Sequence, residues 1–155
     1  MRKVFLLLSL AALAVGLAAV PASASPPIPS SGEFSLLSAV TISTRTAGGN
    51  TFLTVSRTAT LTGTYTGTTT DEGTIVIHKD GSANLRGSGV CVCTVDGRSG
   101  TFEYRFSGTG IFPAALDGHY VIGQGTGGLE GLHAQGPFSG TFVAVTYGGQ
   151  HHFDP

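Results

Sequence analysis

Residues Gly123 to Phe138 have the sequence GQGTGGLEGLHAQGPF, and this stretch decides the fold. Glycine recurs through it, with apolar residues in between. Such a composition fits poorly in a helix or a flat strand, because glycine loses more chain entropy on ordering than any other residue. The stretch instead indicates a sharply bent strand–turn–strand corner in which the backbone passes close to itself. We therefore expect Gly127 or Gly131 to hold a positive φ or to lie against neighbouring backbone.

Outside this corner the chain alternates apolar and polar residues with the period of a β-strand. The cleanest alternation spans Thr58 to Gly67, where threonine occupies every even position. In a strand at 34–42, Phe34, Leu36, Val40 and Ile42 are expected to share one face. Further strands are predicted at 73–79, 83–95, 101–107, 119–122 and 138–147. About eight antiparallel strands result, and a sheet of this size must close or stack on another to protect its edges.

Several sequence blocks carry a resemblance to a known superfamily. The motif G-T-G-x-L-x-G-L-x-x-x-G-x-F in the glycine-rich corner resembles the closing corner of allene oxide cyclase-like barrels. The blocks TGTYTG (62–67), DEGTIVIHKDGSA (71–83) and GRSGTF (97–102) extend the resemblance over 57–142. The chain is similar to an uncharacterised bacterial domain-of-unknown-function family of that superfamily. The resemblance implies an antiparallel eight-stranded β-barrel, whereas the strand pattern alone leaves barrel and sandwich open.

The N-terminus has the features of a secretory signal peptide, predicted over 1–24. Arg2 and Lys3 form a basic start, 4–20 is apolar, and Ala22-Ser23-Ala24 is a signal peptidase site. A membrane anchor is the alternative, since the apolar run is close to the minimum length for spanning a bilayer. The cleavage site favours the signal peptide, so we expect a secreted protein with no membrane segment after cleavage.

The remaining chain is expected to form a single domain. Residues 25–32 are rich in Pro and Ser and are predicted to be a disordered linker. The barrel domain is then assigned to 33–150, and 151–155 to a mobile C-terminal tail. The basic residues are dispersed, and the formal net charge of the chain is −1, so no nucleic-acid partner is expected. No cofactor is expected, and the oligomeric state stays open.

Cys91 and Cys93 are the two cysteines of the chain, in the run V-C-V-C-T. Two residues apart on a strand, both thiols lie on one face. Their Cα atoms should be ~6.6–6.8 Å apart, at or beyond the usual disulfide limit, so a bond would need a local bulge. A disulfide, two free buried thiols, and a soft-metal site with His151 and His152 all remain open. Metal sites need three or four ligands, so no metal is predicted.

The other polar residues indicate a functional site less clearly than the cysteines do. Asp71 and Glu72 are interpreted as solvated residues of a turn, and His78 as facing solvent. No catalytic residue is assigned, because no Ser-His-Asp or Cys-His arrangement follows from the spacing. His151 and His152 are predicted to lie in a solvated C-terminal tail.

Aromatic residues on the predicted inward faces favour a binding function. Tyr65, Phe102, Tyr104 and Phe106 are expected to form the wall of a site for a small apolar ligand. Glu130 lies in the glycine-rich corner, where a carboxylate at a cavity mouth could act as acid or base. The alternative function is an isomerase or cyclase acting on a small hydrophobic substrate, which is an analogy with the plant relatives at the level of the fold.

Overall fold

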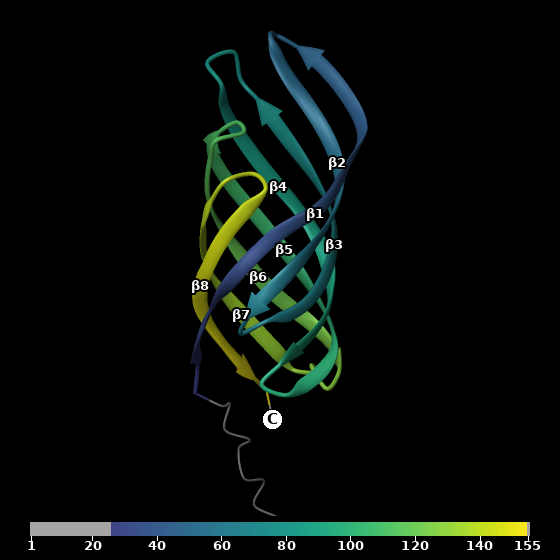
Figure 1. The fold of residues 1–155 in the computed structure, drawn as a ribbon, viewed down its shortest axis with the longest axis vertical. Helices are drawn as coiled ribbons and strands as arrows, with labels where there is room; N and C mark the ends of the chain where they lie inside the picture. The colour runs from purple at the N-terminus through teal and green to yellow at the C-terminus, as the bar shows by residue number, and fades with distance from the viewer. Residues whose placement is uncertain (1–25, 155) are drawn as a thin grey trace, which may run out of the picture.

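The structure is a computed structural model that describes residues 26–154. Its eight β-strands pair in sequence order, and the last returns to pair with the first, so the sheet closes into a barrel-like strand ring (Figure 1). The strands are β1 (Ile28–Ala47), β2 (Asn50–Gly63), β3 (Thr66–Ile77), β4 (Ser82–Val95), β5 (Arg98–Ile111), β6 (Ala115–Gly127), β7 (Leu132–Gly140) and β8 (Ala144–Phe153). Every neighbouring pair is antiparallel, which confirms the predicted all-β fold. Within 26–154, no helix is long and apolar enough to cross a membrane.

Glycine and aromatic residues face each other across neighbouring strands inside the strand ring. The directly opposed pairs are Gly32–Tyr147, Gly87–Phe106, Gly89–Tyr104, Gly118–Phe138 and Gly136–Tyr120. A Cβ atom at Gly32, Gly87 or Gly118 would overlap the aromatic side chain of its partner. Each of these three aromatic side chains therefore lies over the space that its glycine leaves empty, which lets large side chains fill a narrow interior.

The glycine-rich corner forms the turn between β6 and β7. Gly127 and Gly131 have φ values of +63° and +75°, so the prediction of a positive φ is confirmed. Leu129, between them, is fully buried. A Cβ atom at Gly125 would overlap the carbonyl group of Leu129, which shows how closely the backbone passes itself here. The corner places an apolar side chain inside the strand ring and reverses the chain within a few residues.

The two ends of the strand ring differ. At the upper end in Figure 1, the β1–β2 and β3–β4 hairpins project beyond the other strands. β1 pairs with β8 over Ile28–Ser35 and with β2 as far as Ala47. The lower end carries the β6–β7 turn and the C-terminus of the chain.

β1 changes its inward face part-way along its length. A register shift lies between Leu36 and Ser38 in its pairing with β2. Phe34, before the shift, lines the interior, whereas Val40 and Ile42, after it, are 64% and 55% exposed. The prediction that these residues share one face is therefore wrong, because this register shift and a second one between Thr41 and Ser43 interrupt the side-chain alternation.

The first strand begins earlier in the sequence, and the last strand ends later, than the sequence predicts. β1 begins at Ile28, inside the predicted linker 25–32, and pairs there with β8. Pro29 is tolerated because β1 pairs on one side only at this point. β8 extends to Phe153, so residues 151–153 of the predicted tail belong to a strand, and His151 is buried. The predicted signal peptide, 1–24, lies outside the described residues.

Candidate functional site

The strand ring contains a partly open cavity of about 80 Å³. Most of the side chains that line it are aromatic or aliphatic: Phe34, Leu61, Tyr65, Leu85, Phe102, Tyr104, Phe106, Leu116, Tyr120, Ile122, Phe138, Phe142, Val145 and Tyr147. Arg57, Thr69 and Thr141 are the polar exceptions. An apolar cavity of roughly 150 Å³ admits benzene. The cavity as it stands therefore accommodates a group of only a few non-hydrogen atoms.

Four of the five residues predicted to contact a ligand lie in the wall of this cavity. Tyr65, Phe102, Tyr104 and Phe106 are brought together from the β2–β3 turn and from β5. Glu130 is not among them, because it lies exposed in the β6–β7 turn at the lower end.

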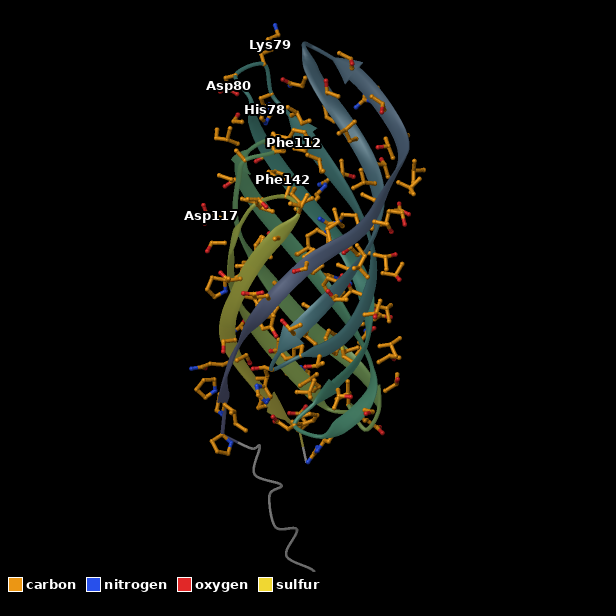
Figure 2. The ribbon with its side chains drawn as sticks, viewed as in Figure 1. His78, Lys79, Asp80, Phe112, Asp117 and Phe142 are labelled. Carbon is orange, nitrogen blue, oxygen red and sulfur yellow. A yellow bond between two sulfur atoms is a disulfide. The ribbon has the colours of Figure 1, made fainter. Side chains whose placement is uncertain are left out.

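Two aromatic side chains lie together at the upper end of the cavity. Phe142, in the turn between β7 and β8, contacts Phe112 edge-to-face with ring centroids 5.0 Å apart (Figure 2). Phe142 is buried and lines the cavity.

A buried ion pair lies beside the cavity, with Arg57 in the cavity wall and Asp71 behind it. Arg57 Nε donates a hydrogen bond to Asp71 Oδ1 at 2.8 Å, and the Tyr104 hydroxyl donates to Asp71 Oδ2, also at 2.8 Å. Asp71 faces Arg57 across the β2–β3 pairing and Gly89 across the β3–β4 pairing. Because Gly89 has no side chain, Tyr104 on the far side of β4 can reach over it to Asp71. The interpretation of Asp71 as a solvated turn residue is wrong, since it lies within β3 and is 3% exposed.

Arg57 is held in an aromatic environment. Its guanidinium lies 4.9 Å from the centroid of the Phe106 ring and 5.6 Å from that of Phe34. The residue is only 7% exposed. Within 26–154, the guanidinium makes one hydrogen bond, through Nε to Asp71. Arg57 lines the cavity, and no buried side-chain nitrogen or oxygen of the described residues lacks a partner, so its other N–H groups are accessible and can donate to a ligand.

Burial keeps the tyrosines of the interior protonated. Burial is the main cause that raises the pKa of Tyr65, Tyr104, Tyr120 and Tyr147, which are all four tyrosines of the chain. For Tyr147 the pKa rises to about 12. For Tyr104 the negative charge of Asp71 raises the pKa further. At neutral pH these side chains are hydrogen-bond donors, not anions.

We expect the folded protein to show no tyrosine ionisation near pH 10, the ordinary pKa of tyrosine. The raised pKa values stabilise the folded state fully below pH 10, and this stabilisation is lost as pH rises toward about 12, the pKa of Tyr147. Tyrosinate absorbance during an alkaline titration measures this directly. The same protein unfolded in guanidinium chloride is the control and should titrate near pH 10. Titration of the folded protein at the control's pH would contradict the buried positions of these side chains.

A second polar cluster lies at the lower end. The Tyr65 hydroxyl donates to Ser30 Oγ at 2.9 Å, and Ser30 Oγ lies 2.8 Å from His151 Nδ1. His151 Nε2 lies 2.8 Å from Asp96 Oδ2. These side chains come from the β2–β3 turn, β1, β8 and the β4–β5 turn. The chain of hydrogen bonds ties the first and last strands together where the strand ring closes.

The Ser30–His151–Asp96 arrangement resembles a hydrolytic triad in composition, but its surroundings do not suit catalysis. Ser30 and His151 are 4% and 1% exposed, and neither lines the cavity. A nucleophile must have space beside it for the group that it attacks. We therefore interpret this cluster as a structural network that satisfies buried polar groups. The burial of His151 in this cluster also shows that the prediction of a solvated tail is wrong for this residue.

Cys91 and Cys93 form a disulfide. Both side chains point inward from β4 and are buried, and their Cα atoms are 5.4 Å apart. The register of β4 with both neighbours is continuous at this point, so the bulge expected for such a bond is absent between these two residues. Among residues 26–154, no three His, Cys, Asp or Glu side chains gather closely enough to hold a metal ion.

Fold and cavity together define a small all-β protein, a closed ring of eight antiparallel strands around an apolar interior. The family described as "Protein of unknown function (DUF3224)" matches residues 30–154, and the chain belongs to this family. A crystal structure of a DUF3224 protein of unknown function from Shewanella oneidensis MR-1 is similar, with a TM-score of 0.65 and 20% identity. The match covers 84% of this chain and 99% of the other. At this identity the likeness shows the fold. No curated protein matches the chain.

Proposed function

We propose that this protein binds a small, largely apolar molecule inside the strand ring. The observation that carries the proposal is the aromatic-walled cavity of about 80 Å³, which lies inside an interior otherwise filled by side chains. Ligand sites are typically concave, mostly apolar and supplied with a few polar groups that orient the ligand. Here the polar group is Arg57, with Asp71 and Tyr104 behind it.

The hydrogen bonds that the buried Asp71 carboxylate accepts favour a binding function over a catalytic one. A general base needs a free oxygen within reach of the proton that it removes. Both oxygens of Asp71 already accept hydrogen bonds, from Arg57 and from Tyr104, and Asp71 does not line the cavity. The carboxylate therefore serves to hold Arg57 in place.

An isomerase or cyclase acting on a small hydrophobic substrate is the second candidate. Arg57 favours it, because a buried guanidinium with free N–H groups could stabilise negative charge that develops on a substrate oxygen. The allene oxide cyclase-like relationship that the glycine-rich corner predicts agrees with this candidate at the level of the fold only. Release of a rearranged product from a bound molecule would distinguish it from simple binding.

The proposed setting of this function is outside the cell. The basic start, apolar run and Ala22-Ser23-Ala24 site indicate export and cleavage after Ala24. A disulfide between Cys91 and Cys93 agrees with an oxidising compartment.

Native mass spectrometry of protein purified from its own host tests the proposal. We expect an additional small mass bound to the wild-type protein. In Val145→Phe, a larger side chain in the cavity wall should remove that mass. Val143→Phe makes the same change at a side chain that is 56% exposed, and it should retain the mass. Equal spectra for all three proteins would contradict binding in the cavity.

A further inference from the structure

We infer that the ligand presents a neutral carbonyl oxygen to Arg57, with its apolar part against the aromatic wall. This inference rests on the proposed function, since it names the class of molecule that the cavity takes. The class comprises small ketones, aldehydes and esters. Free carboxylic acids, which are ionised at neutral pH, are excluded from it.

Arg57 has unused hydrogen-bonding capacity. A guanidinium has five N–H donors. Within 26–154, Arg57 uses the Nε donor on Asp71 and makes no other hydrogen bond. The residue is 7% exposed, and no buried side-chain nitrogen or oxygen of the described residues lacks a partner, so the remaining N–H groups are accessible. A ligand that brings an acceptor can therefore replace the water that these groups would otherwise bind.

The tyrosine hydroxyl groups of the cavity wall already have acceptors. Tyr104 donates to Asp71, Tyr120 donates to the carbonyl of Gly148, and Tyr147 donates to the carbonyl of Thr62. Arg57 is therefore the donor with capacity left in the wall. A guanidinium has no acceptor atoms, so the ligand must supply the oxygen.

The charge balance of the site favours a neutral ligand. Asp71 already neutralises Arg57 through a 2.8 Å ion pair, in which the Asp71 side chain is fully buried. A ligand carboxylate would bring a second negative charge close to Asp71 in a medium of low dielectric constant, where like charges repel strongly. A carbonyl oxygen accepts the same N–H groups without adding charge. The geometry therefore favours a neutral acceptor over an anionic one.

Three probes of matched size test this choice: acetone, isobutane and acetate. Each has four non-hydrogen atoms, which suits a cavity smaller than one that admits benzene. Acetone carries a neutral carbonyl, isobutane carries neither charge nor acceptor, and acetate carries a carboxylate. NMR titration of the purified protein measures their binding through signals of Leu85 and Ile122 in the cavity wall. We expect acetone to bind roughly tenfold more tightly than isobutane, the effect of one added hydrogen bond. Acetate should bind most weakly.

The double variant Arg57→Met/Asp71→Asn removes the donor and the charge together. It should bind acetone and isobutane with equal affinity. Equal binding of acetone and isobutane to the wild-type protein would overturn the role of Arg57 while leaving the proposed cavity intact. Tighter binding of acetate would assign the site to anions instead. Absence of binding by all three probes would overturn the proposed function and this inference with it. The wild-type series decides the outcome even where the variant fails to fold.

Discussion

Asp71→Ala is expected to lower the free energy of unfolding by about 3–5 kcal/mol, the typical effect of removing one partner of a buried ion pair. The reason is the charge that remains. Arg57 is 7% exposed, and the described residues give its guanidinium no acceptor other than Asp71. The Tyr104 hydroxyl also loses its acceptor. Urea denaturation of the variant and the wild-type protein measures the change.

Two controls separate the ion pair from the general effect of losing a carboxylate. Asp117→Ala removes a carboxylate from the exposed face of β6 and should change the stability by less than about 0.5 kcal/mol (Figure 2). Arg57→Met/Asp71→Asn should be more stable than Asp71→Ala, because it leaves no unpaired buried charge. If Asp71→Ala were no less stable than Asp117→Ala, the buried ion pair would be refuted.

Gly87→Val should also destabilise the protein strongly, by about 1–3 kcal/mol or more from overpacking. A Cβ atom at Gly87 would overlap the aromatic ring of Phe106 and the backbone carbonyl of Glu72. The ring can move, but the backbone of β3 cannot move without disturbing its pairing. Thermal unfolding measures the loss.

The neighbouring Ser88→Val is the matched control, because Ser88 is on the exposed face of β4 and its substitution should change the stability little. In a Phe106→Ala background, Gly87→Val should destabilise the protein less than in the wild type, since the overlap with the Phe106 ring has been removed. Identical losses in both backgrounds would show that Phe106 does not lie over Gly87.

The all-β fold and four residues of the cavity wall could be predicted from the sequence. Tyr65, Phe102, Tyr104 and Phe106 share the inward phase because each alternates with polar residues. Periodicity of two is a local property, so it does not depend on which strands become neighbours. The Thr-rich start of β3 has few apolar residues, and this concealed the strand that carries Asp71.

The phase of the alternation could have located the buried ion pair. Asp71 and the inward Ile75 are an even number of positions apart along one strand, so their side chains are expected on the same face. The same holds for Arg57 and the inward Ala59. A charged residue on the apolar face of each of two consecutive strands is a signal of pairing. The Ser30–His151–Asp96 cluster had no comparable signal. Its members meet because β8 closes on β1, and the register of that closure is set by the whole strand ring.

A crystal structure of the protein held under xenon gas tests most directly whether the strand ring receives small apolar molecules. Xenon enters dry apolar cavities and is visible as a strong peak of electron density. We expect a xenon atom inside the strand ring, in contact with Phe102, Leu116 and Ile122 of the cavity wall. A strand ring without internal xenon, or with xenon bound at the outer surface alone, would contradict the claim that its interior receives small apolar molecules.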